Sequence, residues 1–312
     1  MATDVTPQSE LDKLGPLQTA ASVLTGDLRH ALLDELLGAA EAARDAAAAA
    51  ADHPAEAVHS YRKSLRRARA VLSMVSLALP KRERQAVKKA LQDARRSVSA
   101  IRDHAVAPDA LATAELADDT RATAQLVLAQ AAAAQPGTHE IVRRLQDGAV
   151  RAVAQVEALE ASLPRVLELS TIVRGIRDVY AGARDARRRG RKHGDPREFH
   201  RWRRRTKELV YQLQLLGRWA GERTAAIHDI FDDVGDDLSD GVDLIMLGDF
   251  VATYGHGIAT AQLAALEAAI ADHGEHAMTA ARRASKGVFA RSPKRFARKL
   301  ERAVRRDIEP AT

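Results

Sequence analysis

The sequence contains no cysteine, so disulfide bonds and thiolate metal sites are excluded. Aromatic residues make up only 4% of it, and a core must therefore be built mainly from Leu, Val and Ala. No apolar run approaches the roughly 18 residues that a membrane-spanning helix needs. The first residues, MATDVTPQSELDK, lack the apolar core of a secretory signal. We therefore expect a cytoplasmic protein with no membrane partner.

β-Branched runs are also scarce and Ala is abundant, which favours an all-α fold. Pro and Gly divide the chain into candidate helices. In the first half these cover 17–51, 55–80, 81–105, 109–134 and 138–161, with Pro108 as a break. In the second half they cover 165–189, 199–218, 222–238, 244–254, 259–272, 275–291 and 293–306, with an interruption at Gly241. We expect a flexible N-terminal tail over 1–16 and two antiparallel helical bundles, 17–164 and 165–312.

Basic residues are concentrated in a few segments, although the formal net charge is only +6. Residues 174–207 carry fourteen Lys and Arg against four acids, and residues 282–306 carry eleven against one. Charge that is segregated in this way produces a field that attracts a polyanion.

The stretch Phe199 to Leu216 combines an apolar face with a cationic one. Apolar residues recur at steps of three and four, as on one face of a helix (Phe199, Trp202, Thr206, Leu209, Leu213 and Leu216). A second stripe follows one position later and is headed by a histidine (His200, Arg203, Arg204 and Lys207).

An earlier stretch, Val58 to Val75, repeats this pattern. Its cationic stripe contains His59, Arg62, Lys63, Arg66 and Arg69. An offset of 141 residues, from 59 to 200, superimposes the two histidines, most of the bases and the apolar positions. Two copies in register predict an internal duplication and a fold with pseudo-twofold symmetry.

Cations one helical turn apart lie about 5 Å from each other and can meet successive phosphates of a linear chain. Arg gives bidentate contacts and Lys gives point charges. Like charges at this spacing destabilise a helix without ligand, so five bases between Arg62 and Arg69 with no acid favour a bound anion. The alternative is a solvated basic face whose histidines cap or pack.

These motifs resemble the CHAD domain, a helical family with one such histidine motif in each half. The matches include His59-x-x-Arg62-x-x-x-Arg66-x-x-Arg69, His200-x-x-Arg203-x-x-x-Lys207, Tyr180 with Arg184, Asp243-Leu244 and GVFARSPKRFARKL from Gly287 to Leu300. The resemblance covers about residues 24–300. Departures are Val210 in place of an Arg, Arg95-Arg96 in place of Arg-Asp, and a segment that looks lengthened around Gly241.

The resemblance implies two bundles that meet across a basic channel and bind inorganic polyphosphate, without catalysis or cofactor, at polyphosphate granules. It implies a site lined by His59, Arg62, Lys63, Arg66, Arg69, His200, Arg203, Arg204 and Lys207, with further contributions from Arg184, Lys294, Arg295 and Arg298. The family sometimes follows a triphosphatase domain marked by Glu-x-Glu, a pattern that this sequence lacks. We expect no enzyme.

Other interpretations stay open at this point. Nonspecific DNA or RNA binding is one, although few aromatic residues in the motif helices are available for base stacking. A scaffold for an acidic protein partner is another. The acidic segment Asp229 to Asp249 suits a Mg²⁺ or Ca²⁺ site, or ion pairs with a neighbouring helix. His273 and His276 are more typical of an exposed loop than of metal ligands.

Overall fold

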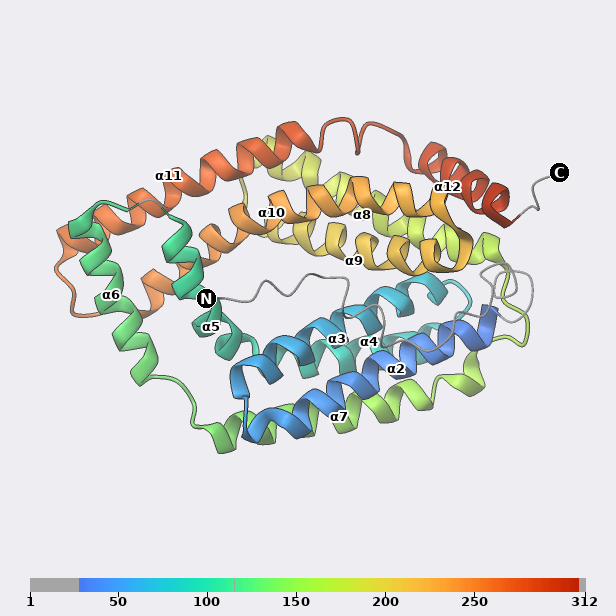
Figure 1. Ribbon diagram of the computed structural model, residues 1–312, viewed down its shortest axis with the longest axis horizontal. Coiled ribbons are helices and arrows are strands. Elements are labelled where there is room, and N and C mark those ends of the chain that lie inside the picture. Colours follow the sequence, from blue (N-terminus) through green and yellow to red (C-terminus); the bar gives the residue numbers. More distant parts are fainter. Residues whose placement is uncertain (1–27, 115, 309–312) are drawn as a thin grey trace.

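The computed structural model describes residues 28–114 and 116–308, and every regular element in this part of the chain is a helix (Figure 1). The prediction of an all-α protein is therefore confirmed. The predicted tail over 1–16 lies outside the described residues. No described helix is long and apolar enough to cross a membrane.

The described residues of the first half form six α-helices: α2 (Leu28–Ala48), α3 (Pro54–Val75), α4 (Lys81–Arg96), α5 (Ser99–Thr113), α6 (Asp118–Ala133) and α7 (Thr138–Glu157). Proline positions two of the starts. Pro54 occupies the first turn of α3, where a missing N–H costs nothing. Pro80 directly precedes α4 in an extended conformation.

Five helices follow in the second half: α8 (Leu169–His193), α9 (Pro196–Ala220), α10 (Glu222–Tyr254), α11 (Thr260–Ala284) and α12 (Pro293–Ile308). The second motif helix, α9, is clearly delimited. Asp195 accepts a hydrogen bond from the backbone N–H of Arg197 at 2.9 Å and so caps its start. Gly221, at φ 140°, ends it in a conformation that only glycine adopts readily.

The predicted single helix over 81–105 is wrong. The chain instead forms α4 and α5, separated at residues 97–98. The side chains of Arg62 and Arg144 donate hydrogen bonds to the carbonyls of Arg95 and Ser97 here. Pro108 does not break a helix but lies within α5, with its ring exposed to solvent. A local proline rule thus placed the break about ten residues too late.

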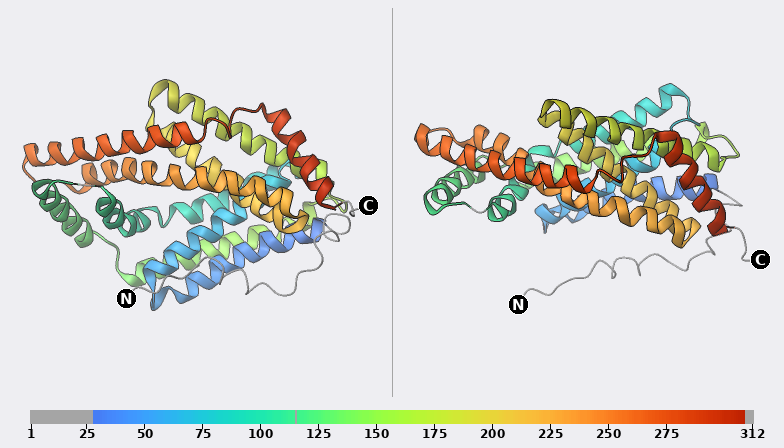
Figure 2. Two further views of the ribbon diagram at one scale, coloured as in Figure 1. Left: turned by 45° about the horizontal axis from the view of Figure 1, so that its top comes forward. Right: turned by 90° about the horizontal axis from the view of Figure 1, so that it is seen from above.

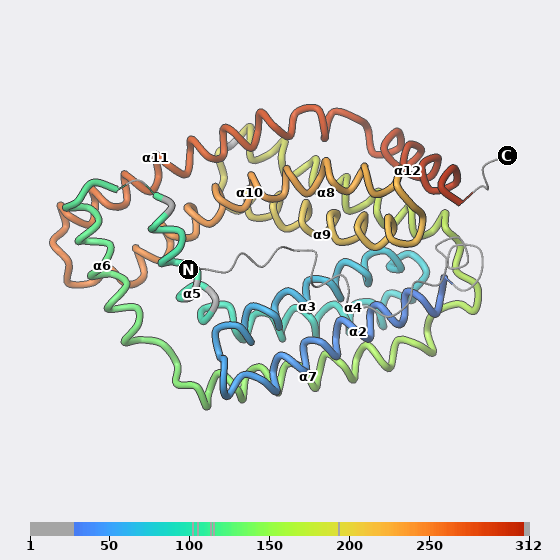
Figure 3. The backbone as a smooth tube through the Cα atoms, viewed as in Figure 1, coloured from blue at the N-terminus to red at the C-terminus, as the bar shows by residue number. Residues whose placement is uncertain are grey.

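Two predicted interruptions in the second half are also wrong. α10 runs unbroken through Gly241, and α11 runs unbroken through Gly274 (Figure 3). A Cβ at Gly241 would lie 2.7 Å from the Sδ atom of Met278 on α11. A Cβ at Gly274 would lie 3.7 Å from the Cβ of Leu244 on α10. Gly241 therefore allows α10 and α11 to pack closely, whereas the contact at Gly274 is an ordinary van der Waals distance. A sequence pattern does not distinguish such glycines from a helix end.

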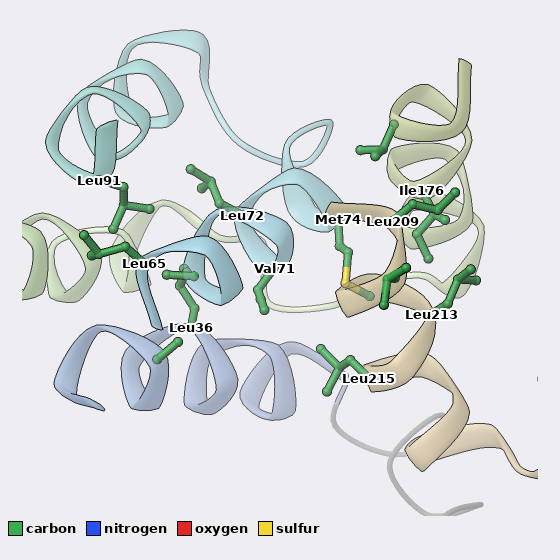
Figure 4. Close-up of a cluster of buried hydrophobic side chains, with 14 of the residues drawn as sticks. Leu36, Leu65, Val71, Leu72, Met74, Leu91, Ile176, Leu209, Leu213 and Leu215 are labelled. Atoms are coloured by element: carbon green, nitrogen blue, oxygen red, sulfur yellow. The ribbon is translucent and has the colours of Figure 1, made fainter. Parts of the chain in front are cut away.

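The larger hydrophobic core is shared by helices from both halves, from α2 to α12. Figure 4 shows side chains of α2, α3, α4, α8 and α9 converging in one part of it. The apolar stripes predicted for the motif helices lie inside it. Tyr61 and Trp202, the largest of these side chains, are both 0% exposed.

A smaller core joins α5 and α6 of the first half to α10 and α11 of the second. It lies at the end of the elongated molecule opposite to α12 (Figure 2). The division into bundles 17–164 and 165–312 stays a prediction. Both hydrophobic cores contain residues from each side of this boundary.

The starts of corresponding helices follow the 141-residue offset of the motifs. α4 begins at Lys81 and α10 begins at Glu222, 141 residues later, and the starts of α3 at Pro54 and α9 at Pro196 follow the offset to within one residue. By the same offset, α5 corresponds to the second part of α10. Internal duplication stays a prediction, with which these bounds agree.

Candidate functional site

The two motif helices, α3 and α9, are held together by buried polar contacts. Gln212 of α9, which is 0% exposed, donates a hydrogen bond from Nε2 to the carbonyl of Ala70 on α3 at 2.9 Å. Ser73 of α3 donates from Oγ to the carboxylate of Glu208 on α9, which is 4% exposed. These contacts fix the position of one cationic stripe relative to the other.

Five arginines gather where the motif helices meet. We call them the arginine cluster: Arg66 and Arg69 of α3, Arg95 of α4, and Arg204 and Arg205 of α9. Burial, and then the charges of Arg69, Arg204 and Arg66, lower the pKa of Arg95 to about 10. Burial lowers the pKa of Arg204 too, and the charges of Arg69 and Arg205 add to the effect. Cations from both halves therefore share one electrostatic environment.

The cluster has little internal neutralisation. The carboxylate next to the cluster is Glu208, which accepts a hydrogen bond from Nη1 of Arg205 at 2.8 Å. Burial lowers the pKa of Arg69 below its ordinary value, and the negative charge of Glu208 acts in the opposite direction. The Nε atoms of Arg95 and Arg205 are buried and find no hydrogen-bond acceptor among the described residues. Buried donors of this kind favour an anionic acceptor from outside the protein.

A groove of about 290 Å³ runs past this cluster. Four cationic side chains from three helices line it (Arg69, Arg84, Lys88 and Arg205), together with Ser73, Ser76, Asp178 and Glu208. Hydroxyl and guanidinium donors therefore outnumber carboxylates, as expected for a surface that binds a phosphate chain.

Two cations of the second motif are paired with the acidic helix α10. Nζ of Lys207 lies 2.6 Å from the carboxylate of Asp236 and 3.9 Å from that of Asp232. Arg203 contacts the carboxylate of Asp243 at 3.6 Å. The acidic segment thus faces the basic stripe as ion pairs, and no group of metal-ligating side chains is assembled among the described residues. A phosphate chain would have to compete with these carboxylates for Lys207 and Arg203.

The first motif is held differently. Arg62 donates from Nη1 to the carbonyl of Arg95 at 3.4 Å and to Oγ of Ser99 at 3.3 Å, so it bridges the break between α4 and α5. His59 and Lys63 lie exposed near the start of α3, and His200 lies half-buried near the start of α9. Of the residues predicted for the site, Arg66, Arg69 and Arg204 are those whose charges act together on Arg95.

Arg184, Lys294, Arg295 and Arg298 lie elsewhere. Arg184 of α8 donates from Nε to the carbonyl of Phe289 at 3.1 Å, and the other three are exposed on α12. On α8, Asp178 and Val179 line the groove, whereas Tyr180 stacks on Phe296 of α12 with ring centroids 4.1 Å apart. At 100° per residue, these two faces of α8 are roughly 150° apart. The structure therefore does not join the α12 cations to the groove.

Four residues of this site were missing from the sequence prediction: Arg84, Lys88, Arg95 and Arg205. Lys88 and Arg95 read as outward positions of an isolated helix, because nothing in the sequence shows what faces α4. The run of three arginines from Arg203 to Arg205 was the available signal for Arg205. Arg203 and Arg204 repeat Arg62 and Lys63 of the first motif, whereas Arg205 corresponds to Ser64.

Comparison with known proteins agrees with this architecture. The family model described as "CHAD domain" matches residues 31–252. The crystal structure of the CHAD domain from the plant Ricinus communis is similar in fold, with a TM-score of 0.59 and 18% sequence identity over 92% of this chain and 95% of that chain. No curated protein matches the sequence. Because the family model spans more than two thirds of the chain, the protein belongs to the CHAD domain family.

Proposed function

We propose that the protein binds inorganic polyphosphate at the arginine cluster and its groove, without catalysis, and that it associates with polyphosphate granules. The observation that carries this proposal is the convergence of Arg69, Arg95 and Arg204 from three helices, close enough that the charges of Arg69 and Arg204 lower the pKa of Arg95. Each approach of like charges costs stability in the free protein. A polyanion bound between them would offset that cost.

The geometry suits a phosphate chain better than a nucleic acid. Guanidinium groups match phosphate oxygens bidentately, and the groove is lined by arginines from three helices, α3, α4 and α9. The motif helices offer few exposed aromatic side chains on which bases could stack, because Tyr61 and Trp202 are fully buried and Tyr211 is half-buried. Nonspecific contacts to the backbone of DNA or RNA remain available to the same cations, so the test must compare the ligands directly.

The test is a titration with long-chain polyphosphate, short-chain polyphosphate and duplex DNA at near-physiological salt. We expect affinity to rise with polyphosphate chain length and to exceed that for DNA. The double variant Arg66→Glu, Arg204→Glu should weaken polyphosphate binding at least tenfold, because two charges of the cluster become repulsive. Neither side chain makes a hydrogen bond or ion pair with a described residue, so helicity measured by circular dichroism should persist.

A matched control carries the same charge reversals outside the cluster. Arg151 is exposed on α7, which contributes nothing to the cluster or the groove, and Arg165 is exposed in the segment before α8. The variant Arg151→Glu, Arg165→Glu should leave affinity within about twofold. Tighter binding of DNA, or equal losses in both double variants, would contradict the proposal. In cells, the tagged protein should lie at granules and the Arg66→Glu, Arg204→Glu variant should not.

A further inference from the structure

The helix α12 has one apolar face and one cationic face, and the second has no part in the arginine cluster. Phe296, Leu300 and Val304 are buried. Eight cations in and directly before the helix are exposed (Arg291, Lys294, Arg295, Arg298, Lys299, Arg302, Arg305 and Arg306). Among them, Arg305 is the one that forms an ion pair with a described residue, Glu301.

Five of these cations line a groove of about 380 Å³: Arg291, Arg295, Arg298, Lys299 and Arg302. Among the described residues, no acidic or aromatic side chain lines it. Lys299 and Arg302 also line a neighbouring groove of about 350 Å³ that continues to Arg306 and to Arg223 on α10. We call the six residues Arg291, Arg295, Arg298, Lys299, Arg302 and Arg306 the α12 surface.

The α12 surface is held in place from both ends of the helix. At its start, Ser292 Oγ accepts a hydrogen bond from the backbone N–H of Arg295, and Phe296 stacks on Tyr180. At its end, the carboxylate of Asp307, which is 3% exposed, accepts hydrogen bonds from the backbone N–H and the hydroxyl of Thr224 at 2.9 and 2.8 Å. The cations therefore project from a positioned scaffold and not from a loose tail.

The α12 surface is separate from the arginine cluster. α8 lies between them, because Asp178 and Val179 face the groove at the cluster while Tyr180 faces α12. Figures 1 and 2 show α12 at the end of the molecule opposite to α6, outside the helices that carry the cluster. One short chain cannot fill both grooves without passing around α8.

We propose that the α12 surface is a second binding site for an extended phosphate chain, so that one protein molecule links two polyphosphate segments. This inference rests on the proposed function of the arginine cluster, and it adds a site that the paired motifs do not contain. Cations at positions 295, 298 and 302 follow the helix at steps of three and four, which places them in a row about 10 Å long. Such a row meets a linear polyanion along its length, and the absence of aromatic residues from its groove disfavours a nucleic acid.

The number of sites is measurable by calorimetric titration of the full chain with short-chain polyphosphate. We expect two chains per protein molecule in the wild type. The triple variant Arg295→Glu, Arg298→Glu, Arg302→Glu should bind one, and so should Arg66→Glu, Arg204→Glu. The two sets combined should bind none. With long-chain polyphosphate, light scattering from cross-linked complexes should fall at least tenfold in either variant.

A control variant makes the same change of six in net charge at exposed positions away from both grooves: Arg121→Glu, Arg151→Glu, Arg165→Glu. It should keep both sites. Two chains bound by the triple variant, or the same loss in the control, would overturn the second site. So would a triple variant that loses duplex DNA binding and keeps both polyphosphate chains. If the three substitutions to Glu destabilise the fold, Arg→Gln at the same three positions removes the charges without reversing them and gives the same readout.

The same experiment separates this inference from the proposed function. A cluster variant that still binds two chains would reject the arginine cluster as a site and leave the α12 surface to be judged by its own variant. If the triple variant and the cluster variant each bind one chain, the result supports both the arginine cluster and the α12 surface as sites.

Discussion

Arg95 of α4 is the residue on which the electrostatic strain of the cluster is concentrated. Its pKa is lowered to about 10 by burial and by the charges of Arg69, Arg204 and Arg66, and its Nε atom has no acceptor among the described residues. The ordinary pKa of an Arg is higher, so the folded state disfavours the charge that the unfolded chain carries freely. We therefore expect Arg95 to destabilise the ligand-free protein.

We predict that Arg95→Leu raises stability by about 1 kcal/mol, or the melting temperature by about 2 °C. The same change should lower polyphosphate affinity about tenfold, because one charge-assisted contact is lost. Thermal unfolding and titration measure the two effects. Below pH 10 the side chain is protonated in both states, so the stability difference should be constant from about pH 6 to 9 and shrink only as pH rises through the folded pKa.

Arg82→Leu on the same helix is the matched control, since Arg82 is exposed and belongs neither to the arginine cluster nor to the groove lining. It should change neither quantity appreciably. A loss of stability in the Arg95→Leu variant would show that Arg95 stabilises the folded state, contrary to this prediction.

At the scale of the helices, close approaches at glycine set the arrangement of the site. Gly175 of α8 packs against the end of α3, where a Cβ would lie 2.5 Å from the carbonyl oxygen of Met74 and 2.7 Å from that of Ser73. Ser73 contacts Glu208 in the α3–α9 junction. The spacing of α8 from α3 therefore fixes one wall of the groove, which Gly175 itself lines.

We predict that Gly175→Ala destabilises the protein by about 2 kcal/mol, because backbone atoms cannot move aside as a flexible side chain can. Gly38→Ala is the matched comparison. Gly38 lies inside α2, and a Cβ there would meet nothing within 4 Å, so alanine should stabilise by roughly 0.5–1 kcal/mol through its higher helix propensity. Denaturant unfolding measures both. Equal effects in the two variants would show that the close contact of α8 with α3 is not rigid.

At the scale of the whole molecule, the smaller core fastens the two halves together away from the cluster. His104 of α5 is 6% exposed and shares a hydrogen bond of 3.0 Å between Nε2 and the hydroxyl of Tyr254 on α10. Its ring also meets Phe250 edge-on at 5.4 Å. Burial lowers the pKa of His104, and the neighbouring Asp103 acts in the opposite direction.

A lowered pKa means that the folded state prefers neutral His104. The stability from this site is present above the ordinary pKa of about 6.5 and is lost as pH falls through the lower, folded value. We predict that between pH 7.5 and 5 the melting temperature of the wild type falls by about 2 °C more than that of His104→Phe. Thermal scans at matched ionic strength test this. Parallel curves would show that His104 does not titrate in this range.

Much of the fold could be predicted from the sequence. The steps of three and four in the two motif stretches placed Tyr61, Trp202 and their neighbours in the core, where the structure has them. The motif stretches also contained Arg66, Arg69 and Arg204, whose charges act together on Arg95 in the structure. That these residues bind a ligand stays a prediction. These features are local or periodic, and a helix displays them in its own residues whatever packs against it.

Contacts between distant segments were decided only by the tertiary structure. The break at 97–98, the uninterrupted helices through Gly241 and Gly274, and the pairing of Lys207 with Asp236 all depend on which helix lies opposite. The same holds for Arg95, which is an ordinary surface position of α4 until α3 and α9 bring their arginines beside it. A residue's spacing determines the face that it occupies, but its charge environment and the room for its side chain depend on neighbours far away in the chain.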